Sequence, residues 1–244
     1  CACLVGSEMC IRDSGKSVTS LSIMGLLGRG GTVTEGSVVF EDKNLLTMTE
    51  KELDKIRGDR LTMIFQDPLT SLDPVFTVGN QLMESIRKHM RLSKEEARKR
   101  AEQILGKVGM PDPHGVMKKY PHTLSGGMRQ RVMIAQAMIN SPSLLIADEP
   151  TRNLDVTIQA GILKLISELQ KEFRVTVLFI ANNLGLVSAV CDQAAILKDG
   201  EILEQVPAKR LLEDTREPYT RQLIDAITPD TGETHHNYLS LIHI

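Results

Sequence analysis

The sequence predicts an α/β protein: a mostly parallel sheet flanked by helices, with an inserted helical subdomain and an antiparallel edge. Short apolar runs of strand length alternate with segments of helical periodicity, which is typical of a parallel sheet covered on both faces. A long charged helical stretch, residues 70–122, interrupts this alternation and is expected to form the subdomain. Asp199-Gly200 between two short runs indicates a hairpin, and therefore antiparallel pairing.

The composition is that of an ordinary globular protein. The chain has 244 residues, 41% hydrophobic and 25% charged, which allows one large domain with a small subdomain. A net charge of −2 and an aromatic content of 3% argue against a nucleic-acid partner. No apolar run approaches the roughly 18 residues of a membrane span, and no secretory signal is visible. The four cysteines lack paired spacing, which suits a reducing compartment.

Local patterns predict the elements in order. The expected strands are 2–5, 37–40, 61–65, 144–147, 175–180, 194–197 and 201–204. The expected helices are 14–27, 49–56, the stretch from 78 to about 108, one that begins near 125, and 155–171, 207–213 and 219–227. Two of these helices carry the spacing of a capping box, Thr49 with Glu52 and Ser93 with Glu96. After residue 228 the pattern dissolves into a polar tail.

The strand at 144–147 ends in two acids, Asp148 and Glu149. Open α/β sheets bind their ligands at the carboxyl ends of the strands. One acid could hold Mg²⁺, and the other could orient or deprotonate an attacking water. Taken alone, such a pair is more often a solvated acidic turn.

Gly15-Lys16-Ser17 lies where a strand is followed by a helix. Such a turn is the end of a phosphate-binding loop, in which the lysine reaches the β and γ phosphates and the serine hydroxyl ligates Mg²⁺. The full pattern needs a glycine five positions before Gly15, where Cys10 stands, and the charge of Asp13 would repel a phosphate. Alone, the motif also fits a solvated lysine beside a helix cap.

Two further positions have ligand-binding chemistry. Gln66 ends the strand at 61–65, where its carbonyl could ligate a metal or position a water; the alternative is a surface loop residue. Gly126 and Gly127 open a helix, and their exposed N–H groups could form an anion site; the alternative is a flexible helix entry.

In chain order, these motifs resemble the nucleotide-binding subunit of ABC transporters, a P-loop NTPase-type fold. The motifs are Gly-Lys-Ser, the strand ending in Gln66, LSGGMRQR at 124–131, and LLIADEPT at 144–151 with a following Asp155. The resemblance covers roughly residues 14–228. FQDPLTSLDPVFTVG at 65–79, GMRQRVMIA at 127–135 and PYTRQL at 218–223 are similar to the subfamily that energises import of dipeptides, oligopeptides or nickel in prokaryotes.

The resemblance implies that ATP and Mg²⁺ are the cofactors and assigns roles to the matching positions. Glu149 would polarise the attacking water, and Asn182 stands where the family usually has a histidine that contacts the γ-phosphate. Asp155 would belong to a loop that crosses a dimer interface. The positions implied for ATP binding are Ser14, Gly15, Lys16, Ser17 and Gln66. Those implied for Mg²⁺ are Ser17, Gln66 and Asp148. Those implied for the signature, acting on ATP held by the facing subunit, are Ser125, Gly126, Gly127 and Gln130.

The implied partners are integral-membrane permease subunits, a second ATP-binding subunit in a homo- or heterodimer, and, indirectly, an extracytoplasmic solute-binding protein; nucleic acid is not expected. The implied location is the cytoplasmic face of the prokaryotic cell membrane. The expected domains are an ATP-binding core at 1–69 and 141–228 and a helical signature subdomain at 70–140, with 229–244 as a disordered or non-native tail.

The sequence also departs from the family pattern. The segment LVG-SEMCIRD-SGKS is four residues longer than the family's phosphate loop, and the early strands with the adenine-stacking aromatic are missing. Residues 7–13 and 235–244 look like foreign sequence joined to a fragment. These departures predict weak ATP binding and little turnover. The alternatives are an impaired partner that supplies only its signature to a competent paralogue, and a soluble ABC ATPase of DNA repair or translation, which the lack of basic charge disfavours.

Overall fold

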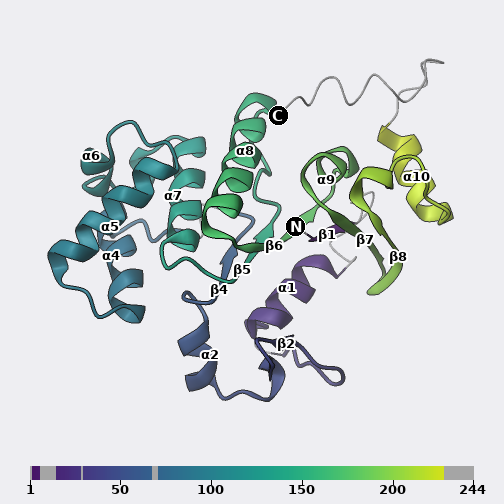
Figure 1. The fold of residues 1–244 in the computed structure, drawn as a ribbon, viewed down its shortest axis with the longest axis horizontal. Coiled ribbons are helices and arrows are strands. Elements are labelled where there is room, and N and C mark those ends of the chain that lie inside the picture. The colour runs from purple at the N-terminus through teal and green to yellow at the C-terminus, as the bar shows by residue number, and fades with distance from the viewer. Residues whose placement is uncertain (1, 6–14, 29, 68–70, 228–244) are drawn as a thin grey trace. The chain divides into compact units, whose positions relative to one another are not determined.

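A computed structural model describes residues 2–5, 15–28, 30–67 and 71–227 of the chain (Figure 1). The chain divides into two compact units, the first made of residues 1–31 and 177–244 and the second of residues 32–176. The predicted domain boundaries at residues 70 and 140 stay a prediction. The predicted foreign segment at 7–13 and the tail at 229–244 lie outside the described residues.

The first unit is built around the strand β1 (Ala2–Val5). This strand lies between β6 (Thr176–Ala181) and β7 (Gln193–Lys198) and is parallel to both. The next strand, β8 (Glu201–Pro207), is antiparallel to β7. The turn between these two strands has φ of 50° at Asp199 and 84° at Gly200, which is the double left-handed backbone of a tight hairpin. The predicted strands and the predicted antiparallel hairpin are therefore confirmed.

The helices of the first unit are α1 (Lys16–Met24), α9 (Leu184–Val190) and α10 (Pro218–Ile227). The prediction that the first helix runs to residue 27 is wrong, because Gly25 adopts a left-handed φ of 62° and its N–H caps the last turn. The helix predicted at 207–213 is only the 3₁₀ turn Ala208–Arg210, since β8 continues to Pro207. The sequence did not predict α9.

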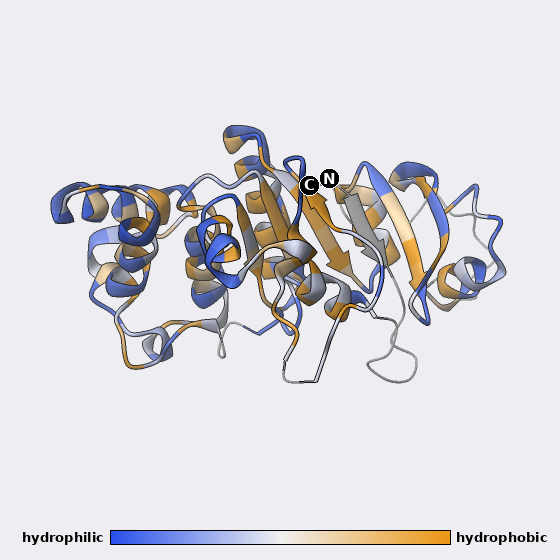
Figure 2. Cartoon of the chain, turned by 90° about the horizontal axis from the view of Figure 1, so that it is seen from below, coloured by the Kyte–Doolittle hydropathy of each residue, from blue (hydrophilic) through white to orange (hydrophobic). Residues whose placement is uncertain are grey.

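The second unit contains a parallel pair of strands, β4 (Leu61–Ile64) and β5 (Leu144–Asp148). Side chains of both strands are buried, which explains their almost continuous apolar sequence (Figure 2). A separate hairpin joins β2 (Val39–Phe40) to β3 (Lys43–Asn44). The 3₁₀ turn Leu45–Thr47 and the helix α2 (Glu50–Ile56) follow, and α2 has the predicted capping box. The long helix α8 (Val156–Phe173) follows β5.

The charged stretch of the second unit folds as helices, as predicted. They are α4 (Val78–His89), α5 (Lys94–Lys107) and α6 (Pro113–Met117), followed by the 3₁₀ turn Pro121–Thr123. The helix α7 (Gly126–Met138) comes next, where a helix was expected to begin near residue 125. The sequence missed α6, where Asp112 caps the helix and Pro113 occupies the first turn.

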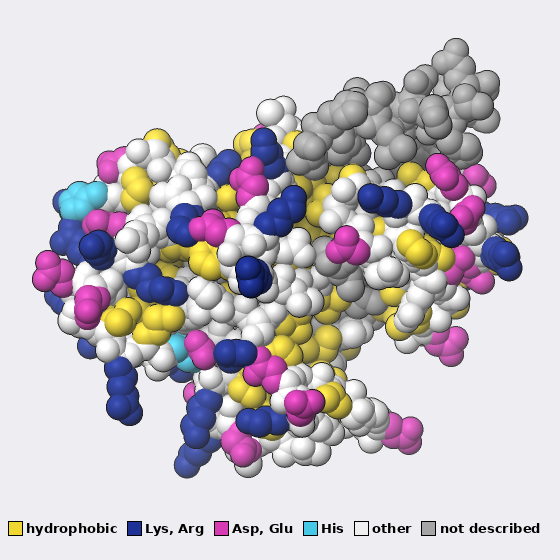
Figure 3. Space-filling model, in the orientation of Figure 1, with side chains coloured by type: hydrophobic (Ala, Val, Ile, Leu, Met, Phe, Trp, Pro, Cys, Tyr) yellow, Lys and Arg dark blue, Asp and Glu magenta, His cyan; other side chains and the backbone are white. Residues whose placement is uncertain are grey.

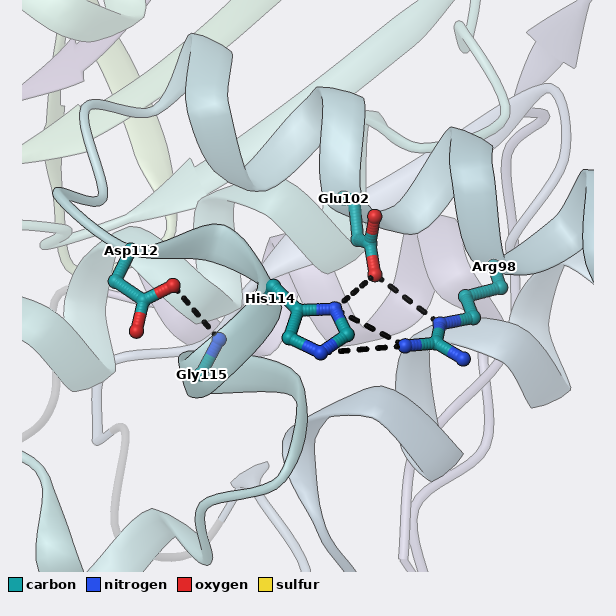
Figure 4. A network of polar contacts seen from close by, with 5 residues as sticks. All are labelled: Arg98, Glu102, Asp112, His114 and Gly115. Atoms are coloured by element: carbon teal, nitrogen blue, oxygen red, sulfur yellow. Dashed lines mark hydrogen bonds and ion pairs between the residues drawn. The ribbon is translucent and has the colours of Figure 1, made fainter.

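Side-chain contacts connect these helices. Glu102 of α5 accepts hydrogen bonds from Arg98, at 3.1 Å, and contacts His114 of α6, at 2.9 Å (Figure 4). Arg131 of α7 donates to the carbonyl of Val108, at 2.5 Å. None of the helices within the described ranges combines the length and apolar character needed to cross a membrane.

Candidate functional site

The strands β4 and β5 bring Gln66 and the two acids to one edge of their pair. Ile64 lies opposite Ala147 in the parallel register, so the residues that follow each strand emerge side by side. Gln66 Nε2 donates a hydrogen bond to Glu149 Oε2 at 2.7 Å. The expectation that these motifs belong to one site is thus supported by a direct contact, while the role of each residue stays a prediction.

Asp148 and Glu149 have different surroundings. Asp148 ends β5 and is only 4% exposed, so a carboxylate is held within the fold at the strand end. Glu149 begins the following turn with a φ of 44°, a conformation that residues other than glycine rarely adopt. Its side chain is 10% exposed. Backbone strain of this kind concentrates at functional sites, where the surrounding fold has to maintain it.

The turn also places Arg152 against Glu149, a contact that the sequence analysis missed. The Arg152 N–H donates to the Glu149 carbonyl at 3.0 Å, and Arg152 Nη1 lies 3.2 Å from Glu149 Oε2. A basic residue three positions after the acid, inside a turn, was the available signal. It could not be interpreted without the left-handed φ of Glu149, which folds the chain back.

The donor set at this edge suits Mg²⁺ bound to a nucleotide. Because Gln66 Nε2 faces Glu149, the carbonyl Oε1 is the atom of Gln66 that suits a hard cation. In the part of the chain that the structure describes, no three or more His, Cys, Asp or Glu residues gather as a metal cage. Mg²⁺ at phosphate sites commonly takes one or two carboxylates and completes its shell with water and phosphate oxygens. Asp148 and Gln66 therefore fit as partial ligands.

In the first unit, the start of α1 has the backbone of an anion site. Gly15 is the N-cap with a left-handed φ of 80°, and its carbonyl accepts the Thr19 N–H at 2.8 Å. Glycine has no side chain with which to cap, so the first N–H groups are not covered by the N-cap residue. Lys16 is only 6% exposed, unusual for a lysine, and Ser17 is exposed. Ser14 and the rest of the predicted loop lie outside the described residues.

Asn182 follows β6 in the first unit. Ala181 lies opposite Val5 of β1, so Asn182 lies at the edge of the sheet where β1 ends. Its amide can hydrogen-bond but cannot change its charge with pH. The neighbouring Asn183 has a structural task, because its Oδ1 accepts the Leu186 N–H at 3.2 Å and caps α9.

The signature residues form the start of α7 in the second unit. Ser125 is the exposed N-cap, and its hydroxyl accepts the Met128 N–H at 3.3 Å, which leaves the hydroxyl proton for donation to a ligand. Gly127 is packed closely, since a Cβ there would lie 3.2 Å from Ile158 Cγ2. Gln130 is only 2% exposed, and its Nε2 has no hydrogen-bond partner among the described residues. Its predicted action on a facing subunit stays a prediction.

Asp155 is the N-cap of α8, and its Oδ1 accepts the Ile158 N–H at 2.9 Å. The side chain therefore stabilises the helix start, and its predicted place in a dimer interface stays a prediction. Val156 directly after it is 81% exposed and Ile158 is 38% exposed, so apolar surface lies beside this cap.

Comparison with known proteins identifies relatives of the chain. The family model described as ABC transporter matches residues 13–152. The oligopeptide transport ATP-binding protein AppD of Bacillus subtilis is 48% identical over 221 residues, which cover 90% of this chain and 67% of the relative. For the dipeptide transport ATP-binding protein DppD of Bacillus subtilis the identity is 46%, over 92% of this chain and 66% of the relative. For the oligopeptide transport protein OppD of the same organism, the chain spans 59% of the relative's length.

Solved structures give the same result for the fold. The ATP-binding cassette MJ0796, in a dimeric post-hydrolysis state bound to ADP and Pi, has a TM-score of 0.73 and 29% identity, covering 85% of this chain and 84% of that chain. The protein cbiO1 of Clostridium perfringens, part of the ABC transporter complex cbiONQ, has a TM-score of 0.72 and 26% identity, covering 93% and 84%. These neighbours confirm the predicted P-loop NTPase-type α/β fold. With a family match over more than half of its length, the chain belongs to the ABC transporter family.

Proposed function

We propose that this chain is the ATP-binding and ATP-hydrolysing subunit that energises import of peptides, or of nickel, through a membrane ABC transporter. The observation that carries the proposal is the contact between Gln66 and Glu149 at the acidic strand end. An amide and a carboxylate in contact at a strand end are groups that could together bind a metal-bound phosphate and orient an attacking water, which supports the proposal. The relatives named as oligopeptide and dipeptide transport ATP-binding proteins support peptides as the cargo.

In the proposed reaction, the protein positions the reactants and supplies charge. In the first unit, Lys16 would bind the β and γ phosphates and Ser17 would offer its hydroxyl to Mg²⁺; in the second unit, Gln66 and Asp148 would offer oxygen ligands to Mg²⁺. The chemistry that Mg²⁺ supplies is neutralisation of charge on the phosphate oxygens. Glu149 orients the attacking water and polarises it. The rate enhancement comes from positioning and from prearranged charge.

The proposed partners are a second ATP-binding subunit and membrane permease subunits at the cytoplasmic face of the membrane. Ser125, with its exposed hydroxyl at the start of α7, suits an anion presented by a facing subunit. Val75 and Phe76 are 70% and 52% exposed, which supports a protein contact at these two residues. Acids and bases are interspersed on the face drawn in Figure 3.

The proposal includes an impaired phosphate loop. Asp13 adds a negative charge where a phosphate has to bind, and the loop is longer than the family's. We therefore expect weak ATP binding and slow turnover.

Asn182 in place of the family histidine favours a second candidate function, a partner subunit that contributes its signature to a competent paralogue. Mixing this chain with such a paralogue should then raise hydrolysis above the sum of the separate rates.

The proposed function is tested by measuring ATP affinity with a fluorescent nucleotide and turnover by phosphate release. Replacing residues 7–13 with a glycine-rich loop should increase both. In that background, Glu149→Gln should lower turnover by about 100-fold or more and leave affinity unchanged, because a general base contributes about that much. Unchanged affinity after the loop replacement contradicts the account of the loop, and turnover that survives Glu149→Gln contradicts the role of Glu149.

A further inference from the structure

The carboxylate of Glu149 is held from two separate segments of the second unit. Gln66, after β4, donates to Oε2 at 2.7 Å, and Arg152, in the turn after β5, contacts the same Oε2 at 3.2 Å. The backbone of Arg152 is fixed at the same time, because its N–H donates to the Glu149 carbonyl at 3.0 Å. Arg152 therefore contacts the acid through both its main chain and its side chain.

These two contacts restrict the rotation of the carboxylate plane of Glu149. The last side-chain torsion of a glutamate is broad and rotates readily. Two donors on one oxygen, from directions set by two different segments, restrict that rotation. The turn is itself held in an uncommon backbone, with φ of 44° at Glu149 and 60° at Asn153. We propose that Arg152 is a positioning residue that fixes the carboxylate plane of Glu149, so that Glu149 can orient the water that attacks ATP. This inference rests on the proposed function.

The chemistry of arginine suits this task. Its planar guanidinium has several donors in a fixed geometry, whereas a lysine is a point charge on a flexible stem. The side chain of Arg152 is 40% exposed and that of Glu149 is 10% exposed. Ion pairs with an exposed member contribute little to stability. The benefit of the contact is therefore the orientation of the proposed catalytic group, and catalysis is sensitive to small errors of that kind.

The kinetic test compares Arg152→Ala, Arg152→Lys and a matched control, Arg98→Ala, in the loop-replaced full chain. Arg98 is also a half-exposed arginine paired with a glutamate, Glu102, at 3.1 Å. Arg152→Ala should lower kcat about three- to tenfold without changing the KM for ATP, as expected for lost positioning. The kcat of Arg152→Lys should lie between those of Arg152→Ala and the parent chain, and the kcat of Arg98→Ala should equal that of the parent chain. An unchanged kcat in Arg152→Ala, or a changed KM with kcat intact, overturns the inference.

A second measurement does not depend on turnover. Thermal melting of the nucleotide-free chain is measured for Arg152→Ala, Glu149→Ala and the double variant. If Arg152 holds Glu149, the loss of Tm in the double variant should be smaller than the sum of the single losses by roughly 1–3 °C. Strictly additive losses overturn the inference. A chain that binds ATP but does not hydrolyse it overturns the proposed function instead, and the melting cycle alone then decides whether Arg152 holds Glu149.

Discussion

Glu204, in β8, connects that strand to the segment before α10. Its carboxylate accepts hydrogen bonds from Thr215 Oγ1 at 2.5 Å and from the Arg216 N–H at 3.1 Å. Partial burial by itself would raise the pKa of Glu204, but these hydrogen bonds to the charged form outweigh it and hold the pKa below the ordinary 4.5. The folded state thus stabilises the ionised carboxylate.

A carboxylate whose pKa is lowered on folding contributes stability above its unfolded pKa, and this contribution is lost as the pH falls through the folded pKa. At pH near 7, Glu204→Gln should therefore lower the Tm, by roughly 2–4 °C. The Tm difference from the parent chain should shrink once the pH falls below 4.5. Melting curves at both pH values check this. A Tm difference that is the same at both pH values would mean that the charge of Glu204 does not stabilise its contact with the segment before α10.

At the scale of residues, the sequence predicts chemistry well and orientation poorly. Gln66 and Glu149 were expected at one site because the family resemblance implied it, and the parallel register of β4 and β5 brings them into contact. The contact of Arg152 could not be predicted, because it depends on a left-handed turn that no glycine announces. For Gln130, a polar residue in a signature motif gives no indication that its side chain is buried.

At the scale of elements, helix starts are the most predictable features. Both capping boxes form: Thr49 with Glu52 at the start of α2, and Ser93 with Glu96 at the start of α5. In the second, the Ser93 hydroxyl accepts the Glu96 N–H at 3.3 Å, and the Glu96 carboxylate accepts the Ser93 N–H at 2.8 Å. Local residues alone complete this geometry, which explains why a single sequence is sufficient to find it.

Removal of this cap should measurably weaken the protein. Ser93→Ala leaves N–H groups of α5 without their partner and should cost about 1 kcal/mol, or roughly 2–4 °C in Tm. Ser93→Thr keeps the hydroxyl and serves as the control, with a much smaller loss expected. Differential scanning calorimetry of the three chains measures both. Equal Tm values for Ser93→Ala and the parent chain would show that the cap is replaced by solvent at no cost.

The elements that the sequence missed are short. The seven residues of α9 and the five residues of α6 span two turns or fewer, too little for a helical period to show. The predicted helix at 207–213 failed for a related reason, because pairing of β8 with β7 continues to Pro207 and leaves only a 3₁₀ turn. Tertiary pairing decided these boundaries, and local preference did not.

At the scale of the whole molecule, the alternation of strands and helices was sufficient to predict the fold class, since parallel strands need crossover connections. Lys16 and Asn182 belong to the first compact unit, and Asp148 and Ser125 belong to the second.

Assembly gives a test at this scale. The proposed function requires two subunits to close over ATP, so the Glu149→Gln variant of the loop-replaced chain should double its mass from 27.0 kDa when ATP and Mg²⁺ are added. Adding a charge at the proposed anion site with Ser125→Glu should prevent the doubling, because like charges repel. Light scattering after gel filtration measures the mass, with ADP as the control nucleotide. A mass that stays at 27.0 kDa with ATP would contradict closure.

The position of β1 has a consequence for how the protein is made. The strand is made long before its two neighbours in the sheet, which are contributed by residues 178–181 and 193–196. Until those residues have been made, this apolar segment lacks its neighbouring strands and has to be kept from associating elsewhere. Completion of this part of the sheet therefore waits for residues 193–196, and such long-range pairing slows folding.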